Sequence, residues 1–251
     1  MIVAILQARV GSARLPGKVL ADLAGQPMLL RQAERIAASH RIDRLVVATS
    51  TSPQDDPLAI LCAKAGIACH RGALDDVLDR VHAAAKAQAA DWVVRLTGDC
   101  PLIDPAVIDL VIETATNSGA DYVTNAVEPT WPDGLDVEVA RIEALDAAWR
   151  EATLPSEREH VMPFIRNRPD RFRIVHVRQD EDLSDLRWTV DEPEDLEFVR
   201  AVYARLYPAN PAFTTRDILD LLERDPSLSL VNASFARNEG YAKSLEKDKS
   251  A

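Results

Sequence analysis

The chain has 251 residues, of which 47% are hydrophobic, so it is long enough to bury one substantial core. Its 40 acidic residues outnumber its 29 lysines and arginines, and the resulting formal charge of -11 argues against nucleic-acid backbones or anionic membrane surfaces as main partners. Any phosphate ligand must therefore be met by a local cluster of cations.

The cysteines indicate a reducing compartment. Cys62, Cys69 and Cys100 lack the paired spacing of a zinc site and do not suggest a disulfide framework. The first apolar run, residues 2–6, is too short for a signal-peptide core or a membrane span. We therefore expect a cytoplasmic protein without a membrane partner.

The first predicted element is a buried strand over residues 2–6, which leads directly into a loop of cations and glycines. In an open α/β sheet, ligands bind beyond the carboxyl ends of strands, where loop N–H groups and cations can meet a polyanion. Five residues separate Gly11 from Gly17, one more than the Walker phosphate loop allows, and the glycines of the dinucleotide fingerprint are absent. The loop is predicted to bind a nucleotide in another way; the alternative is a surface turn whose cations are merely solvated.

Strands and helices then alternate with short connections. We expect helices at 28–40, 58–65, 75–90 and 105–117, and strands at 44–49, 67–70, 92–97 and 121–124. Repeated β-then-α units of this kind predict a single α/β domain whose mostly parallel, twisted sheet carries helices on both faces.

The alternation breaks after residue 125. A Pro/Gly turn and a period-2 segment over 128–139 predict an antiparallel hairpin or lid. Further helices are expected at 144–151, 157–167, 193–206 and 215–224, and strands at 172–177 and 186–190. The domain is expected to span residues 1–238. Residues 239–251 are polar and alternate lysine with acidic residues, which predicts a flexible tail that is either a frayed helix or disordered.

Three segments resemble the CTP-dependent sugar cytidylyltransferases, especially the SpsF-like branch. They are residues 7–18 (QARVGSARLPGK), 96–102 (LTGDCPL) and 188–196 (WTVDEPEDL). The family includes enzymes that activate 3-deoxy-manno-octulosonate and N-acylneuraminate. The resemblance implies a fold like that of the nucleotide-diphospho-sugar transferases and a homodimer. It also implies a Mg²⁺-dependent enzyme that couples CTP to a sugar, by expectation a sugar acid, for surface polysaccharide synthesis.

Two aspartates are the candidate metal ligands. Asp99 follows the predicted strand 92–97 at the same sheet edge as the opening loop, and a carboxylate there suits Mg²⁺; alternatively it only stabilises the turn. For Asp191, the residues alone leave a ligand and an ordinary cap of helix 193–206 equally open. The resemblance implies that Asp191 is a magnesium ligand opposite Asp99.

Two cations of the opening loop are the candidate catalytic residues. When an acceptor hydroxyl attacks the α-phosphate of CTP, negative charge develops on the leaving pyrophosphate. Arg14 and Lys18 are expected to stabilise that charge, and no covalent protein nucleophile is required.

The remaining candidates are expected to bind the two substrates. The nucleotide contacts are predicted to be Gln7, Ala8, Arg9, Gly11, Ser12, Thr49, Arg71 and Thr97. The sugar contacts are predicted to be Asp133, Asp136, Arg158 and His160. For Thr49 and Arg71 plain loop polarity is the alternative, and for the sugar set a solvated strand face or a capping box. Asp76 and Arg80 are interpreted as a helix start and an i,i+4 pair, not as ligands.

Two other functions stay open at this point. A glycosyltransferase of related fold would use a nucleotide sugar, but the chain lacks a D-x-D motif after a central strand, which disfavours it. A non-catalytic nucleotide-binding module is the second alternative. It would be stabilised by CTP without releasing pyrophosphate.

Overall fold

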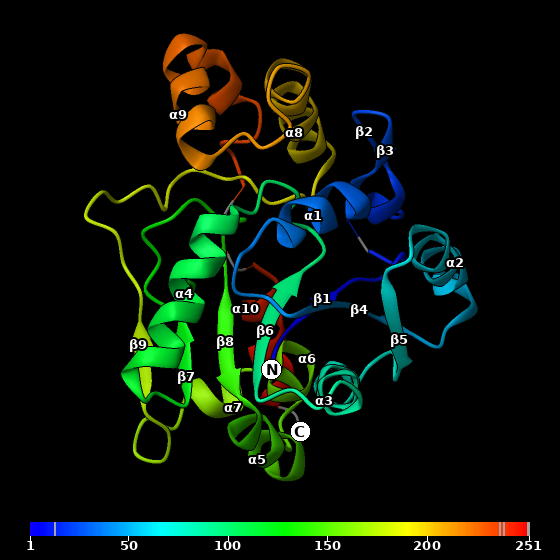
Figure 1. Ribbon diagram of the computed structural model, residues 1–251, viewed down its shortest axis with the longest axis vertical. Coiled ribbons are helices and arrows are strands. Elements are labelled where there is room, and N and C mark those ends of the chain that lie inside the picture. Colours follow the sequence, from blue (N-terminus) through cyan, green and yellow to red (C-terminus); the bar gives the residue numbers. More distant parts are fainter. Residues whose placement is uncertain (13, 236, 238, 250–251) are drawn as a thin grey trace.

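A seven-stranded sheet of order β5-β4-β1-β6-β8-β7-β9 forms the centre of the molecule (Figure 1). The computed structural model describes residues 1–12, 14–235, 237 and 239–249. The strands are β1 (Ile2–Gln7), β4 (Arg44–Ser50), β5 (Ala68–Gly72), β6 (Trp92–Thr97), β7 (Tyr122–Thr124), β8 (Glu138–Arg141) and β9 (Ile174–His176). Only β8 runs antiparallel to its neighbours within this sheet, and β2 (Asp22–Leu23) and β3 (Gln26–Pro27) form a separate small hairpin. The predicted α/β class and mostly parallel sheet are confirmed.

Helices cover both faces of the sheet (Figure 1). They are α1 (Met28–Ala37), α2 (Asp56–Ala65), α3 (Val77–Ala87), α4 (Pro105–Ser118), α5 (Ile142–Glu151), α6 (Pro155–His160), α7 (Pro163–Arg166), α8 (Pro193–Leu206), α9 (Thr215–Arg224) and α10 (Glu239–Asp248). Short 3₁₀ turns lie at η1 (Lys18–Leu20), η2 (Pro53–Asp55) and η3 (Pro226–Leu230).

Alternate residues of β1 pack into two separate cores, which explains its continuous apolar sequence. Ala4 and Leu6 join the core beneath α1, α2, α4 and α8, whereas Val3 and Ile5 join the core beneath α3, α5 and α7. All four side chains are fully buried. A strand covered on both faces has no polar side, so the period-2 signal disappears. None of the helices in the described part of the chain is long and apolar enough to cross a bilayer.

The antiparallel element predicted over residues 128–139 is present as β8, which begins within that segment and lies inside the sheet between β6 and β7 as a strand rather than a lid. The second half differs from the prediction in two other places. Residues 186–190 form no strand beyond an isolated parallel bridge between Asp133 and Arg187. Their backbone bonds to loops instead, because Trp188 N donates to Asp133 O and Val190 N donates to Asp99 O. The predicted helix 157–167 is divided into α6 and α7 at Val161, whose φ of 70° lies outside the helical region, and Pro163 has no backbone N–H with which to continue the helical hydrogen bonds.

The expected flexible tail contains a helix. α10 packs against α6, where the backbone N–H of Ser156 donates to Asp248 at 2.9 Å. The hydroxyl of Ser156 donates to the same carboxylate at 2.6 Å. Of the two expected alternatives, a frayed helix and a disordered segment, the structure has a helix, and tertiary contacts rather than an apolar stripe hold it.

Candidate functional site

Lys18 lies at the centre of the site, beyond the carboxyl ends of β1 and β6. Its ammonium nitrogen is 2.8 Å from Asp191 Oδ1, 3.5 Å from Asp99 Oδ2 and 2.6 Å from the carbonyl oxygen of Val190. Burial alone would lower the pKa of Lys18, but the charges of Asp99 and Asp191 outweigh it and raise the pKa. Two acids 92 positions apart in the chain therefore share one buried cation.

Arg14, four residues before Lys18 in the opening loop, approaches one of these two acids, Asp191. Its guanidinium is 2.7 Å from Asp191 Oδ2 and 3.5 Å from Glu192 Oε1. Both predicted catalytic cations thus converge on Asp191.

A glycine brings Asp99 next to the opening loop. Gly98 N donates to Gln7 O at 2.8 Å, which continues the pairing of β6 with β1 by one residue. A Cβ on Gly98 would lie 2.8 Å from the Ala8 Cβ and 3.1 Å from Gln7 O. Burial would raise the pKa of Asp99, but Lys18 and hydrogen bonds from Thr97 and Cys100 lower it, so this carboxyl is ionised.

Substitution of Gly98 by alanine is expected to destabilise the fold and shift Asp99. The added methyl group has no room against the Ala8 Cβ and backbone, so the cost should be about 1–3 kcal/mol, the usual range for overpacking. Chemical denaturation would measure it. Gly119→Ala is the comparison, because it adds backbone strain at a φ of +69° without crowding. The nearest atom to its added Cβ is the end of the Arg173 side chain, at 3.5 Å. An equal or smaller loss for Gly98→Ala would contradict the packing argument.

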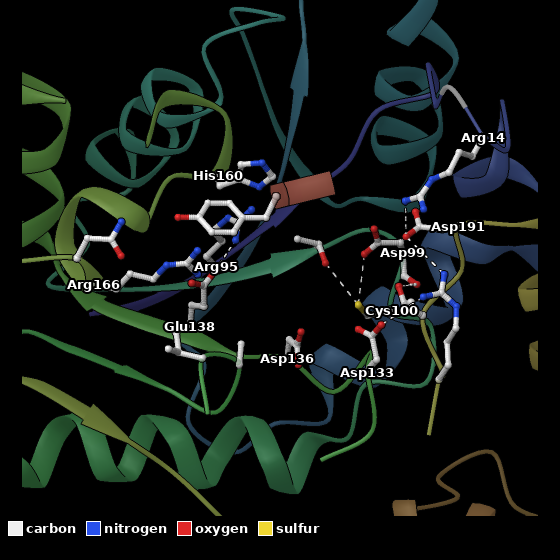
Figure 2. Close-up of a pocket in the computed structure, with 17 residues that line it drawn as sticks. Arg14, Arg95, Asp99, Cys100, Asp133, Asp136, Glu138, His160, Arg166 and Asp191 are labelled. Atoms are coloured by element: carbon white, nitrogen blue, oxygen red, sulfur yellow. Dashed lines mark hydrogen bonds and ion pairs between the residues drawn. The ribbon is translucent and has the colours of Figure 1, made fainter. Parts of the chain in front are cut away.

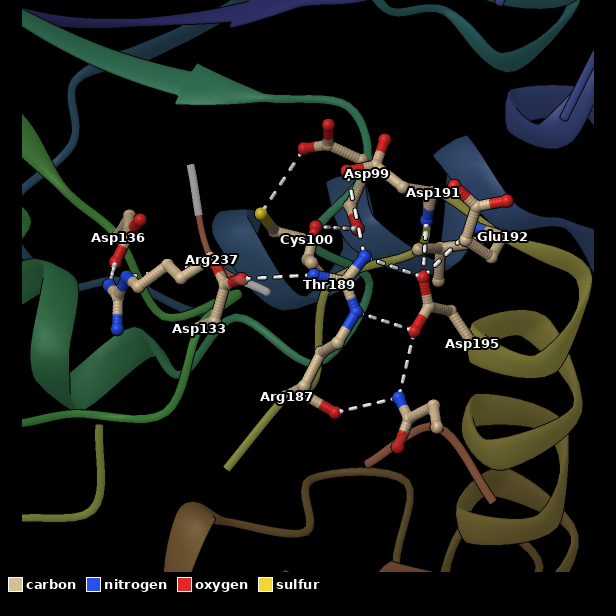
Figure 3. A network of polar contacts seen from close by, with 12 residues as sticks. Asp99, Cys100, Asp133, Asp136, Arg187, Thr189, Asp191, Glu192, Asp195 and Arg237 are labelled. Carbon is tan, nitrogen blue, oxygen red and sulfur yellow. Dashed lines mark hydrogen bonds and ion pairs between the residues drawn. The ribbon is translucent and has the colours of Figure 1, made fainter. Parts of the chain in front are cut away.

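A buried network holds Asp191 in place (Figure 3). Arg187 bonds both oxygens of Asp195 at 2.8 Å, and Asp195 accepts from the backbone N–H groups of Asp191 and Glu192 at 2.9 Å. The Asn232 amide adds a 2.8 Å bond to Asp195. Glu192, not Asp191, is the N-cap of α8. The carboxylate of Asp191 therefore does not cap α8, which was the alternative to a metal-ligand role that the sequence left open.

The site is a cleft with two lobes that meet at these acids. The first, called here the loop lobe, has a volume of about 730 Å³ and lies over the opening loop. The second, the acidic lobe, has a volume of about 520 Å³ and lies over β6 and β8. The two lobes share Arg14, Arg95, Thr97, Asp99, His160 and Asp191.

Most predicted site residues line this cleft. The loop lobe contains, of that set, Gln7, Ala8, Arg9, Ser12, Arg14, Lys18, Thr97, Asp99, Arg158, His160 and Asp191. The acidic lobe contains Asp133 and Asp136 and shares His160. Arg158, predicted to contact the sugar, lies in the loop lobe, where it donates to Asp76 at 3.0 Å and to Trp149 O at 2.9 Å.

Three predicted nucleotide residues line neither lobe. Thr49 is fully buried within β4. Arg71 supports the turn after β4, because it donates to Ser50 O at 2.9 Å, to Ser52 O at 3.0 Å and to Asp56 at 2.6 Å. Gly11 packs against the side chain of Gln54, where an added Cβ would lie 2.8 Å from the amide oxygen. Each therefore has a structural role that its position after a strand or in a loop did not reveal.

Two arginines of the cleft were missed by the sequence analysis. Arg80 is 1% exposed and lines the loop lobe; its expected partner Asp76 pairs with Arg158 instead. Arg95 projects from β6, donates to the Gln7 side chain at 3.2 Å and pairs with Glu138. A charge inside an apolar strand is costly unless it is paired, so the position of Arg95 in the sequence already indicated that its side chain has a partner or a function.

The acidic lobe has one acidic side and one basic end (Figure 2). Asp99 and Asp191 lie at one end of the lobe, and Asp133 and Asp136 lie along its side. The other end contains two arginines, Arg95 and Arg166, together with His160 and Glu138. Burial raises the pKa of Asp136 to about 7 even though Arg237 pairs with it. Burial, aided by the charge of Arg95, lowers the pKa of His160 to about 4, so its ring is neutral at pH 7.

The donor set fits a metal ion shared with phosphate better than a cage made of protein alone. Within the described residues, no group of three or more histidine, cysteine, aspartate and glutamate side chains is arranged around one point. The pair Asp99 and Asp191 lies where the two lobes meet. Mg²⁺ commonly takes one or two carboxylates and completes its octahedron with phosphate oxygens and water.

Comparison with known proteins gives consistent results. The family model for cytidylyltransferases matches residues 3–221. The spore coat polysaccharide biosynthesis protein SpsF of Bacillus subtilis is 34% identical, over 90% of this chain and 95% of that protein. A solved cytidylyltransferase from Leptospira borgpetersenii superposes with a TM-score of 0.87 at 30% identity, over 94% of this chain and 99% of that one. A 3-deoxy-manno-octulosonate cytidylyltransferase of Trichlorobacter lovleyi is 40% identical over 45% of this chain and 44% of its own length.

Proposed function

Since this chain belongs to the cytidylyltransferase family, and is thus a CTP-using nucleotidyltransferase, we propose that it couples CTP to a sugar acid with the aid of Mg²⁺. The products are a CMP-sugar and pyrophosphate, and the pathway is surface polysaccharide synthesis. One observation carries the proposal: a cationic lobe and an acidic lobe meet at Asp99, Lys18 and Asp191. The expected homodimer is part of this proposal.

CTP is placed in the loop lobe because its charges complement a triphosphate. Arg9, Arg14, Lys18 and Arg80 all line it, in a protein whose net charge is -11. Such a local concentration of cations is what a polyanion requires in an otherwise acidic protein. The α-phosphate then lies nearest the junction of the lobes, within reach of a hydroxyl in the acidic lobe.

Asp99 and Asp191 would hold Mg²⁺ at that junction. The ion would supply Lewis-acid polarisation of the phosphates and neutralise their charge. Lys18 and Arg14 stabilise the pyrophosphate as it leaves, since they gain their strongest interactions when charge moves onto it. The Arg187–Asp195 network keeps Asp191 oriented, so little reorganisation is needed during the reaction.

The acceptor sugar is placed in the acidic lobe. The carboxylates of Asp133 and Asp136 can accept hydrogen bonds from sugar hydroxyls. At the far end, the guanidinium groups of Arg95 and Arg166 line the lobe together with one carboxylate, that of Glu138. Glu138 can neutralise only one of the two positive charges, so one remains. That excess positive charge favours an acceptor with a carboxylate of its own.

The test is pyrophosphate release. CTP with Mg²⁺ and a panel of sugar acids should give pyrophosphate and a CMP-sugar, whereas ATP, GTP and UTP should give far less. The matching neutral sugars serve as the control for the carboxylate. Release of a nucleoside diphosphate from a nucleotide sugar would instead indicate a glycosyltransferase. Thermal stabilisation by CTP without any release would indicate a binding module.

The reaction should slow on the acidic side of neutrality because of Asp136. Its pKa is raised to about 7, so below that pH it becomes protonated, loses its negative charge and accepts hydroxyl hydrogen bonds more weakly and with fewer lone pairs. We expect kcat/KM for the acceptor to fall as the pH drops from 8 to 6, measured by pyrophosphate release.

The amide variant of this residue isolates its contribution. Asp136→Asn does not titrate, so its activity should be lower and lack this acid limb. Glu128→Gln, at a surface position that pairs with Arg178, is the control and should keep it. An unchanged profile in Asp136→Asn would assign the limb to another group.

A further inference from the structure

The inner face of α10 lines both lobes of the cleft. Tyr241, Ser244 and Lys247 are three residues apart, a spacing that places side chains on one face of a helix. Tyr241 lines the acidic lobe and Lys247 lines the loop lobe. Ser244, between them, is 2% exposed. The helix begins after residue 221, where the match to the family model ends.

The contacts of α10 are specific at each of these positions. Lys247 is 3.4 Å from Glu159 on α6, and the next residue, Asp248, accepts both hydrogen bonds of Ser156. The ring of Tyr241 lies 4.4 Å beneath the guanidinium of Arg166, in the basic end of the acidic lobe. This geometry is that of a cation–π pair. α10 therefore supports the side of the lobe that faces the acceptor.

Ser244 fixes the orientation and tautomer of His160. Its hydroxyl is 2.9 Å from the carboxylate of Glu159, which can only accept, so the serine donates there. His160 Nε2 lies 2.9 Å from the same hydroxyl oxygen and must then be the donor. In a neutral ring, Nδ1 is left with its lone pair as a hydrogen-bond acceptor. His160 lines both lobes, so through Ser244 the helix α10 determines that Nδ1 is the ring atom that can accept a hydrogen bond from a substrate hydroxyl.

We propose that α10 is a substrate-recognition helix in which Tyr241 contacts the acceptor sugar, Lys247 contacts CTP, and Ser244 positions His160 between them. The inference rests on the proposed function, since it assigns the acidic lobe to the acceptor and the loop lobe to the nucleotide. Acceptor selection is then made in part by residues beyond the region that the family model describes.

Point variants of the full chain separate the roles. Tyr241→Ala should raise the KM for the acceptor about tenfold and leave the KM for CTP within about twofold, as expected for one lost aromatic and polar contact. Tyr241→Phe keeps the ring over Arg166 and should show a smaller rise. The control is Tyr207→Phe, immediately after the end of α8, where Arg31 lies 4.2 Å over the ring; Tyr207 lines neither lobe, so the change should alter neither KM.

The other two positions should give different patterns. Lys247→Ala should raise the KM for CTP severalfold and leave that for the acceptor unchanged. Ser244→Ala should raise the KM for the acceptor, and Ser244→Thr, which restores a hydroxyl, should recover most of the loss. Equal effects of Tyr241→Ala and Lys247→Ala on both constants, or no effect of either, would overturn the proposal in favour of a purely structural helix.

Amide hydrogen exchange distinguishes a failure of this inference from a failure of the proposed function. CTP with Mg²⁺ should protect residues 8–18, and CTP with a sugar acid should additionally protect residues 239–248. Protection of the loop with unchanged exchange in α10 under both conditions would refute the role of α10 alone. No protection of the loop and no pyrophosphate release would refute the proposed function, and the inference with it.

Discussion

Substitution of Lys18 by alanine is expected to lower kcat by about 100- to 1,000-fold and to raise the KM for CTP much less. That range is typical for removing one preorganised donor from a site where charge develops. Lys18 is buried and lies within 3.5 Å of both Asp99 and Asp191, so it has little freedom to reorganise during the reaction. Its contribution should therefore be larger in the transition state than in the CTP complex. Steady-state pyrophosphate release at saturating CTP measures kcat directly.

Two comparisons make the Lys18 result interpretable. Lys86→Ala removes a lysine of α3 that pairs with Asp146 of α5. The lysine side chain is 52% exposed and lies outside both lobes, so the change should leave kcat unchanged. Loss of the Lys18 charge should also raise the pKa of Asp99, since that charge is the main influence lowering it. A variant that folds and keeps the wild-type kcat would exclude Lys18 from the stabilisation of the leaving group.

The sequence revealed the centre of the site because the relevant residues directly follow apolar strands. Parallel strands bring their carboxyl ends to one edge, so the opening loop and Asp99 could be placed together without any structure. Asp191 lies at the same point for a different reason. The apolar run before it is not a strand, but the loop backbones at residues 99 and 133 hold it beside β6. The location was correct although the predicted element was wrong.

Thr49 and Arg71 show the limit of the same rule. Both lie at carboxyl ends of parallel strands, yet neither lines the cleft, because the rule identifies an edge and not the direction of each side chain. β4 and β5 lie on the far side of β1 from β6, and the turn after β4 uses Arg71 to bind its own carbonyl groups. Only tertiary structure determines which strand ends border the lobes.

The C-terminal part of the site could not be predicted for a different reason. Tyr241, Lys247 and Arg237 lie in a polar segment whose composition predicts flexibility. Their partners lie 75 to 101 residues earlier in the chain: Tyr241 packs against Arg166, Arg237 pairs with Asp136, and Lys247 pairs with Glu159. No local pattern signals such contacts. The acidic lobe and the residues of α10 beside it are accordingly the part of the cleft that local sequence patterns predict least well.

If Asp99 holds Mg²⁺ as proposed, its substitution by asparagine is expected to abolish most of the activity, with kcat/KM for CTP lowered at least about 1,000-fold. The change keeps size and hydrogen bonding but removes the negative charge that Mg²⁺ requires of its ligands. Binding should weaken as well: a ligand present at about 100 times its Kd adds about 2.7 kcal/mol to wild-type stability, and little of this should remain in the variant. Thermal shifts with CTP alone and with CTP plus Mg²⁺ measure the loss.

The difference between those two shifts separates the metal from the fold. The ammonium nitrogen of Lys18 also lies 2.8 Å from Asp191 and 2.6 Å from Val190 O, and neither contact depends on Asp99. The variant should therefore melt near the wild-type temperature without ligand. Asp220→Asn, which removes an exposed partner of Arg216 on α9, should behave as wild type throughout. If Asp99→Asn retained the full extra stabilisation by Mg²⁺, the metal would have to bind elsewhere. Asp99 would then serve only to orient Lys18, because that ammonium is its charged neighbour at 3.5 Å.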